Sequence, residues 1–192
     1  EEYMRILLIR HGDPDYAADG LTAAGQREAM LLAERIAPMD IQEYLVSTMG
    51  RARETAEILF PEAYRRPDPG LWEMDFGLFD GRCWQEMEQD SLYRDWVEGE
   101  CRGRCPGGED REDFCDRVCD AVRGILVREL EAGVDEVTIV AHGGTQMALL
   151  ERWGSPSRDY YRWQSRCGCG WLLSWEIETQ KLSLLREISY LK

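Results

Sequence analysis

The sequence predicts an α/β sandwich with a largely parallel sheet. Residues 4–9 and 136–141 are almost continuously apolar, which is typical of strands buried on both faces of a parallel sheet. Segments with helical apolar spacing separate these strands along the chain, and this alternation indicates an α/β fold. The 192 residues are enough for one hydrophobic core, so we expect a single domain over residues 1–192.

Helix-capping residues and apolar spacing place the other elements. The first helix follows Thr22, a residue type that caps helix N-termini, and ends before Pro38. The further elements that we expect are a strand at 43–47, a helix at 51–60, one or two short helices within 81–97, a loop at 101–110, helices at 110–131 and 144–153, and strands at 170–177 and 182–189. We interpret residues 81–109 as an excursion that covers the site.

Tryptophans and arginines stand out in and near this excursion. We expect Trp72, Trp84 and Trp96 to pack in the core or over it rather than to bind substrate. The excursion contains four arginines, Arg82, Arg94, Arg102 and Arg104. We expect one or two of the four to reach the far end of a substrate and the others to be solvated.

The acidic balance of the chain excludes two classes of partner. Lys and Arg number 23 against 37 Asp and Glu, a formal net charge of −14, so nucleic acid and an anionic membrane surface would both repel the protein. A small anionic substrate remains compatible, because a few arginines in one cleft reverse the potential locally. The first apolar run is six residues long, far short of the roughly 20 needed to span a bilayer.

Cysteine usage and the N-terminal residues favour a cytoplasmic protein. The N-terminus lacks the basic flank and the small-residue cleavage site of a signal peptide. Seven cysteines without such a signal indicate free thiols in a reducing compartment. The alternative is a structural metal site, because Cys115 and Cys119 are four residues apart on an expected helix, as are Cys101 and Cys105 just upstream. These spacings differ from the Cys-x2-Cys pairs of zinc sites, so we favour free thiols.

Both histidines of the chain stand at the ends of buried strands. His11 follows the first strand in Arg10-His11-Gly12, and His142 follows the strand at 136–141 in His142-Gly143. Ligands of α/β sheets bind beyond the carboxyl ends of the strands, where these residues lie. We expect Gly12 to let the chain turn tightly, so that Arg10 and His11 reach one cleft.

The pairing of these residue types indicates phosphoryl transfer. The planar guanidinium of Arg10 suits a phosphoryl group. A neutral histidine is a nucleophile near pH 7 without a strong base. The combination of Arg10 and His11 therefore predicts a phosphate site with a nucleophilic histidine.

Six segments resemble the histidine phosphatase superfamily, also called phosphoglycerate mutase-like, and follow the order of that family. They are LLIRHGDPDY (7–16), LTAAGQREAM (21–30), STMGRARETAEIL (47–59), LWEMDFGLFDG (71–81), PGGED (106–110) and VAHGGT (140–145). The resemblance implies a three-layer α/β/α sandwich with a mostly parallel sheet. It also implies a reaction that needs no metal and no cofactor.

The resemblance assigns roles to particular residues. His11 would take the phosphoryl group, and Glu73 would be the general acid that protonates the leaving oxygen. Arg10, Arg51 and His142 would hold the equatorial oxygens, and the motif register selects Arg51 over Arg53. The substrate-binding residues would also include the N–H of Gly143 at a helix start and the pocket-lining carboxylates Asp13 and Glu109.

Some positions depart from the family's pattern, and they bear on substrate preference. Asp13 stands where Glu or Gln is usual, Asp110 replaces a Ser, and Gln146-Met147 follow the second His-Gly where Ile-Arg is frequent. The stretch 82–106 is shorter and less basic than in cofactor-dependent mutases. We therefore expect a phosphatase that acts on a small phosphorylated metabolite, with a cofactor-dependent phosphoglycerate mutase as the alternative.

Finer expectations concern the substrate and the competing classes of function. The chain length and the Pro-Gly-Gly-Glu loop are similar to those of α-ribazole phosphatases. A metal-dependent hydrolase with His11 and His142 as ligands is disfavoured, because the arginines beside them would repel a cation. A non-catalytic module that binds a phosphorylated ligand is also disfavoured, because all the catalytic residue types are present. The sequence leaves the oligomeric state open, with a homodimer among the alternatives.

Overall fold

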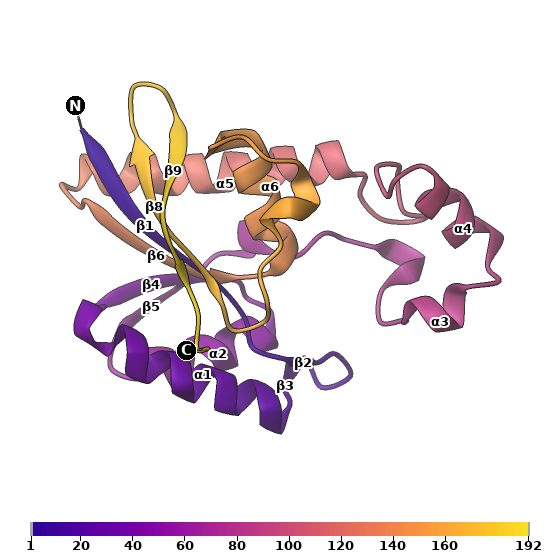
Figure 1. The fold of residues 1–192 in the computed structure, drawn as a ribbon, viewed down its shortest axis with the longest axis horizontal. Coiled ribbons are helices and arrows are strands. Elements are labelled where there is room, and N and C mark those ends of the chain that lie inside the picture. Colours follow the sequence, from indigo (N-terminus) through magenta and orange to yellow (C-terminus); the bar gives the residue numbers. More distant parts are fainter. Residues whose placement is uncertain (1, 192) are drawn as a thin grey trace.

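A seven-stranded sheet in the order β5-β4-β6-β1-β8-β9-β7 forms the centre of the computed structural model, which describes residues 2–191 (Figure 1). The strands of this sheet are β1 (Tyr3–Arg10), β4 (Glu43–Val46), β5 (Tyr64–Pro67), β6 (Glu136–Ala141), β7 (Gly154–Ser155), β8 (Gly170–Glu176) and β9 (Lys181–Ile188). A separate small hairpin consists of β2 (Pro14–Asp15) and β3 (Gly20–Leu21).

The sheet is mostly parallel, as predicted. Strands β5, β4, β6 and β1 pair in parallel, and β7 is parallel to β9. Strand β8 is antiparallel to both of its neighbours, β1 and β9. Because β1 and β6 are parallel neighbours with Arg10 opposite Ala141, the residues that follow the two strands emerge at the same edge of the sheet.

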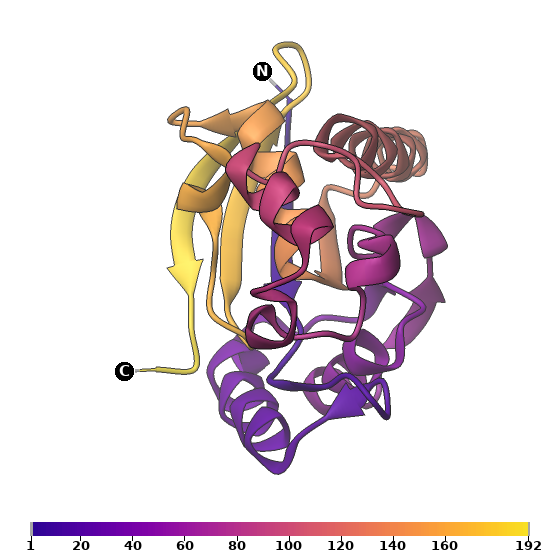
Figure 2. The same cartoon turned by 90° about the vertical axis from the view of Figure 1, so that its right-hand side faces the viewer.

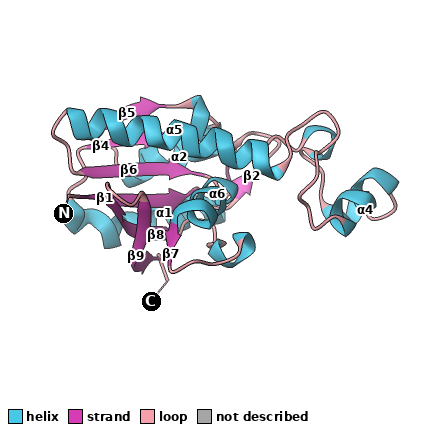
Figure 3. Ribbon diagram, turned by 90° about the horizontal axis from the view of Figure 1, so that it is seen from above, coloured by secondary structure: helices cyan, strands magenta, loops and turns pink. Residues whose placement is uncertain are grey.

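Helices cover both faces of the sheet and complete a three-layer α/β/α sandwich (Figures 1 and 3). One face packs against α1 (Ala23–Ile36) and α2 (Gly50–Leu59), with Ile9, Leu32 and Ala56 in the shared core. The other face packs against α5 (Arg111–Glu131) and α6 (Gly143–Trp153), with Leu8, Val122 and Leu149 in a second core. Burying apolar side chains of both helix layers against the sheet is the main stabilising contribution.

Side-chain caps fix the starts of two helices where the sequence predicts them. Thr22 Oγ1 accepts a hydrogen bond from Gly25 N at 3.0 Å, and Asp110 Oδ1 accepts one from Asp113 N at 2.8 Å. Each cap satisfies a backbone N–H that the helix leaves unpaired, a contribution of about 1 kcal/mol. The predicted N-cap at Thr22 is confirmed.

Residues 81–109 form an excursion beyond the carboxyl ends of the parallel strands (Figures 1 and 2). It carries α3 (Trp84–Met87) and α4 (Ser91–Glu98), which confirms the short helices expected there. Phe79, Tyr93 and Trp96 pack together, with ring centroids 5.5–6.1 Å apart. Four 3-10 helices occur in the described chain: η1 (Ala37–Met39), η2 (Pro69–Leu71), η3 (Gly77–Phe79) and η4 (Tyr160–Trp163).

Some local expectations were wrong. Trp72 and Trp84 are exposed, at 45% and 58% of their full surface, whereas Trp96 is half-buried. The short strands β2, β3, β5 and β7 were not predicted. β5 (YRRP) lacks an apolar pattern, and it is a strand because β4 offers it a parallel hydrogen-bonding edge.

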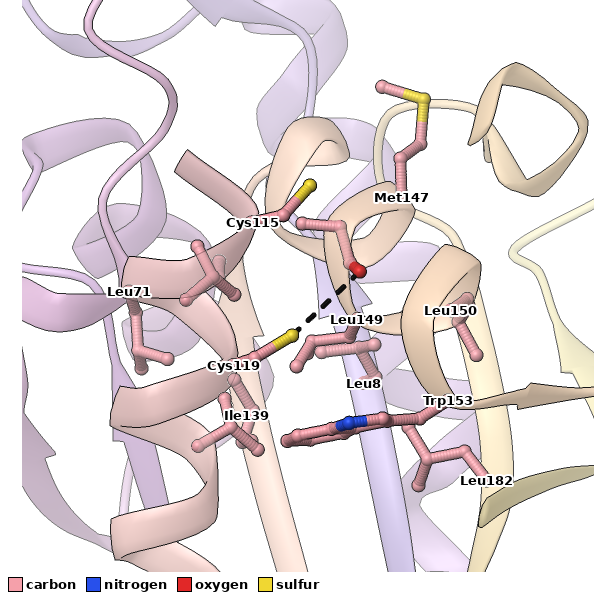
Figure 4. Packing of buried hydrophobic residues seen from close by; sticks show 14 of the residues in the cluster. Leu8, Leu71, Cys115, Cys119, Ile139, Met147, Leu149, Leu150, Trp153 and Leu182 are labelled. Carbon is pink, nitrogen blue, oxygen red and sulfur yellow. Dashed lines mark hydrogen bonds between the residues drawn. The ribbon is translucent and has the colours of Figure 1, made fainter. Parts of the chain in front are cut away.

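Buried cysteines act as small apolar side chains in the core beneath α5 and α6 (Figure 4). Cys115 and Cys119 lie among Leu71, Leu149 and Trp153, and Cys119 Sγ is 4.0 Å from the carbonyl oxygen of Ala148. Burial raises the pKa of Cys115 to about 12 and that of Cys119 to about 11.

The structure does not support the alternative of a cysteine metal site. All seven cysteines are free thiols. Within residues 2–191, no three His, Cys, Asp or Glu side chains gather in a way that could hold a metal ion. In the same range, no helix has the length and apolar character needed to cross a membrane.

The burial of these thiols predicts their order of reaction with an alkylating reagent. The thiolate is the nucleophile, so exposed Cys83 should react within minutes, while Cys105, Cys115 and Cys119 should react only after unfolding. Peptide mapping by mass spectrometry in native buffer and in denaturant measures both patterns. Rapid labelling of Cys115 or Cys119 in native buffer would contradict the packing described.

Candidate active site

His11 lies buried just beyond the end of β1, with 2% of its surface exposed. Its Nδ1 is 2.7 Å from the carbonyl oxygen of Gly12, and since a carbonyl only accepts, Nδ1 carries the hydrogen. Nε2 therefore keeps its lone pair. Burial, together with the positive charges of Arg10 and Arg51, lowers the pKa of His11 to about 4. The imidazole is neutral at pH 7 and available as a nucleophile.

His142 faces His11 from the end of β6, where it is the N-cap residue of α6. The two ring centroids are 5.2 Å apart at an interplanar angle of 68°. His142 Nε2 is 2.8 Å from the hydroxyl of Ser47, which follows β4. Complete burial, followed by the proximity of His11 and Arg51, holds the pKa of His142 well below its usual value. Both histidines are therefore neutral at pH 7.

Arg10, the last residue of β1, lies against the start of α6. Its Nη1 donates to the carbonyl oxygen of Ser165 at 2.6 Å, and Ser165 Oγ donates to Gln146 Oε1 at 2.5 Å. A Cβ on Gly143 would lie 2.9 Å from Arg10 Cζ, so the glycine makes room for the guanidinium. Gln146 is completely buried, which makes it a rigid support for the Ser165 loop.

Arg51 reaches the same place from the first turn of α2. Only 12% of its side chain is exposed, and Nη1 donates to Asp19 Oδ1 at 2.9 Å. Partial burial opposes the charge on Asp19, but hydrogen bonds from Gly50 N and Arg51 outweigh it and lower the pKa of the carboxyl. Arg53, by contrast, is half exposed and pairs with Glu57. Arg51 therefore lies near His11, whereas Arg53 lies on the solvent-exposed side of α2.

Three nitrogen atoms around His11 are buried without a hydrogen-bond partner. In the described chain, the buried unpartnered side-chain atoms include Arg10 Nε, Arg51 Nε and His142 Nδ1. An unsatisfied buried polar group costs about 1–3 kcal/mol, so three in one place destabilise the fold unless a ligand pairs with them. Oxygen atoms of a phosphoryl group would satisfy them together, with two positive charges balancing the anion.

Glu73 lies on the other side of the α6 N-terminus, on the loop after η2. Its Oε1 accepts from Met74 N at 2.9 Å and its Oε2 from Gly144 N at 3.2 Å. A Cβ on Gly144 would lie 1.9 Å from Glu73 Oε1, so only glycine permits this approach. The Gly143-Gly144 pair thus admits Arg10 on one side and Glu73 on the other.

An ion pair between Arg117 of α5 and Glu109, which lies just before this helix, holds the loop that carries Glu73. Arg117 makes two hydrogen bonds to Glu109, of 2.9 and 3.0 Å, and donates to the backbone oxygen of Glu73 at 3.2 Å. Glu109 Oε1 also accepts from Asp75 N at 2.9 Å. Glu109 is therefore a support for the Glu73 loop, and the structure does not place its carboxylate beside the histidines.

The carboxylate of Asp13 likewise has a partner within the protein. Its Oδ2 accepts from Thr22 Oγ1 at 2.7 Å, which ties the chain after β1 to the N-cap of α1. The pocket-lining role of Asp13 and Glu109 stays a prediction; the structure shows that both carboxylates have partners within the protein. Gly143, the third expected binding residue, does open α6 next to Arg10.

Gly12 is required for a reason other than the expected one. Its φ angle does not lie in the left-handed region, so the turn itself does not demand glycine. A Cβ on Gly12 would instead lie 2.6 Å from the carbonyl oxygen of Gly25 at the start of α1. Gly12 N donates to Thr55 Oγ1 at 3.1 Å. The glycine thus allows close packing of the strand end against α1 and α2.

Sequence reasoning assigned no supporting role to the residues that hold these side chains in position, although Ser47 lies in a quoted motif and Gln146 was noted as a departure from the family's pattern. They are Asp19, Ser47, Arg117, Gln146 and Ser165, which come from five separate segments. The site contacts that they make span 19 to 155 residues of the chain. Spacing within one segment carries no signal for such contacts.

The low pKa of His11 gives a direct test, because the chain has only two histidines. NMR of histidine-labelled protein should resolve two imidazoles that both stay neutral from pH 8 to 5. The resonance of His11 should titrate near pH 4. His11→Asn assigns the two signals. A histidine that titrates near 6.5 would contradict the burial and charge described.

The Glu109–Arg117 pair predicts a difference between two acidic residues near the start of α5. Glu109→Gln breaks a partly buried, two-bond ion pair and should lower the free energy of unfolding by about 1–2 kcal/mol. Glu112→Gln, whose exposed carboxylate pairs with Arg152 at 3.0 Å, should change it by less than about 0.5 kcal/mol. Urea unfolding measures both variants, and equal effects would refute the supporting role of Glu109.

Comparisons with known proteins agree with this arrangement. Residues 6–188 match the family described as "Histidine phosphatase superfamily (branch 1)". The chain is 31% identical over 153 residues to the probable phosphoglycerate mutase GpmB of Salmonella choleraesuis, covering 73% of this chain and 70% of the relative.

Two solved structures are similar over nearly the whole chain. The α-ribazole phosphatase from Shigella flexneri has a TM-score of 0.79 at 25% identity, with 97% of each chain covered. A phosphoglycerate mutase from Bacillus anthracis has a TM-score of 0.80 at 17% identity, covering 98% of this chain and 94% of that one. The protein has the phosphoglycerate mutase-like fold and belongs to branch 1 of the histidine phosphatase superfamily.

Proposed function

We propose that the protein is a metal-independent phosphatase that hydrolyses a small phosphomonoester through a phosphohistidine at His11. The observation that carries this proposal is the group of buried, unpartnered nitrogens of Arg10, Arg51 and His142 around a neutral His11. Such a group fits a phosphoryl dianion and places a nucleophile beside it. Membership of the family supports the same class of chemistry.

In the first step, His11 Nε2 attacks phosphorus and the bond from phosphorus to the ester oxygen breaks. Nδ1 keeps its hydrogen bond to the Gly12 carbonyl, which orients the ring and stabilises the cationic phosphohistidine. Arg10, Arg51 and His142 bind the equatorial oxygens as charge develops on them, and the N–H of Gly143 adds a donor. Glu73, protonated, gives its proton to the leaving alcohol.

In the second step, water attacks the phosphohistidine. Glu73, now a carboxylate, takes a proton from the water, the bond between nitrogen and phosphorus breaks, and inorganic phosphate leaves. His11 and Glu73 return to their starting forms. The hydrogen bonds from Met74 N and Gly144 N hold the Glu73 carboxyl group in place through both steps. No metal ion or cofactor takes part.

Phosphatase activity is favoured over mutase activity by the excursion. A mutase must retain a bisphosphorylated intermediate, which needs free positive charge over the site. Here Arg82, Arg102 and Arg104 are exposed and each pairs with a carboxylate, so that, among residues 2–191, Arg94 is the one arginine of the excursion outside an ion pair. The alternative of a cofactor-dependent phosphoglycerate mutase rests on the name of the Salmonella relative. The similarity to the Shigella structure makes α-ribazole phosphate one candidate substrate.

We also propose a cytoplasmic location and a small phosphorylated metabolite as the partner. Seven free thiols fit a reducing compartment. The net charge of −14 disfavours nucleic acid and anionic membranes.

Phosphate release in EDTA tests the function. The substrates are p-nitrophenyl phosphate, 3-phosphoglycerate, sugar phosphates and α-ribazole phosphate. His11→Ala should abolish release, and Arg51→Met should lower kcat/KM by about 10²–10³ because a phosphoryl ligand is lost. Arg53→Met is the matched control on the same helix, and its kcat/KM should stay within about twofold.

Other outcomes would point elsewhere. Isomerisation of 3-phosphoglycerate upon addition of the bisphosphate, without hydrolysis, would identify a mutase. Activity that survives His11→Ala would refute the nucleophile, and activity that EDTA removes would refute the metal-free reaction.

A further inference from the structure

A pocket with aromatic walls opens beside Glu73. Glu73 and Gly144 form one side of it, and Phe76, Trp96 and Tyr160 form its walls. Its empty volume, open mouth included, is about 360 Å³. The proton that Glu73 gives in the proposed reaction goes to the leaving oxygen, so the group attached to that oxygen must lie next to Glu73. This pocket is the cavity that adjoins that position.

Arg111, the first residue of α5, also lines this pocket. Its Cζ lies 4.4 Å from the ring centroid of Tyr160 and 5.1 Å from that of Tyr161. Nη2 donates to the carbonyl oxygen of Glu100 at 2.8 Å and lies 3.4 Å from the hydroxyl of Tyr161. Only 4% of Arg111 is exposed.

This buried guanidinium has no carboxylate partner. None of the ion pairs among residues 2–191 includes Arg111, whereas Arg104 nearby pairs with both Asp110 and Asp113. Stacking on tyrosine returns about 1–2 kcal/mol, less than the several kcal/mol that desolvating a charge costs. The hydrogen bonds of Arg111 in this structure use only Nη2, which leaves Nε and Nη1 as donors at the pocket.

We propose that this pocket binds the leaving group of the substrate and that Arg111 selects a leaving group bearing a carboxylate. One guanidinium balances one carboxylate and matches its planar, two-oxygen geometry. A second phosphoryl group would need more positive charge, as the pair Arg10 and Arg51 supplies at His11. The aromatic walls bury the carbon skeleton between the ester oxygen and the carboxylate. The inference rests on the proposed phosphatase function and adds the substrate class.

The test uses two pairs of phosphomonoesters that differ at one group. The first pair is 4-carboxyphenyl phosphate and its neutral amide, 4-carbamoylphenyl phosphate; the second is 3-phosphoglycerate and glycerol 3-phosphate. The wild type should favour the carboxylate of at least one pair by about tenfold in kcat/KM, mostly through KM, and tenfold corresponds to about 1.4 kcal/mol. Arg111→Met should remove that preference while the neutral partner changes by less than about threefold.

Two further variants separate binding from folding. Arg111→Lys keeps the charge without the planar fork and should retain part of the preference. Arg104→Met removes an exposed arginine from the loop just before α5 and should leave the carboxylate preference unchanged. If Arg111→Met does not fold, the reduced preference of Arg111→Lys carries the test.

The outcomes distinguish this inference from the proposed function. Suppose that the wild type releases phosphate from p-nitrophenyl phosphate but shows no carboxylate preference in either pair. That result would overturn the role of Arg111 and leave the phosphatase intact. A preference that survives both Arg111→Met and Arg111→Lys would do the same. Failure of the wild type to release phosphate from every ester, p-nitrophenyl phosphate included, would overturn the proposed function and the inference with it.

Discussion

The concentration of buried positive charge and neutral imidazoles at one edge of the sheet is the constraint on which the rest of the structure depends. Burial lowers the pKa of both His11 and His142, and the nearby positive charges of Arg10 and Arg51 add to the effect. A fold gains nothing from such an arrangement by itself, because unpaired buried donors destabilise it. The arrangement becomes favourable when an anion binds to these donors. The same unpaired donors therefore lower the stability of the free protein and provide the proposed phosphate site.

The surrounding structure positions these arginines and histidines mainly through hydrogen bonds to the backbone and through the space that glycines leave. It does not pair each arginine with a carboxylate. Ser165 O and Gln146 fix Arg10, and the Gly12 carbonyl fixes the His11 ring. Gly143 and Gly144 let Arg10 and Glu73 approach the start of α6 from opposite sides. Asp19 is the acid that pairs with Arg51, and its half-buried carboxylate also accepts a hydrogen bond from Gly50 N at 2.7 Å.

The sequence predicted the main elements and proposed five site residues, but it did not predict how those residues are supported. Strands β1 and β6 have strong apolar runs and Thr22 is a clear cap, so local chemistry was sufficient there. Asp13 and Glu109 were assigned to the pocket by adjacency to motifs, and that reasoning did not predict their tertiary contacts with Thr22 and Arg117. Arg111 was not singled out at all, because its burial and its lack of a counter-charge exist only in the folded chain.

The most direct test of the account is mass spectrometry of the protein quenched during turnover of p-nitrophenyl phosphate, with peptide mapping of any adduct under conditions that preserve phosphoramidates. The account predicts one phosphoryl group, located on the peptide that contains His11 and absent from His11→Ala. An adduct on another residue would contradict the account. Steady phosphate release with no adduct at any quench time, together with inversion of configuration at phosphorus, would contradict it as well.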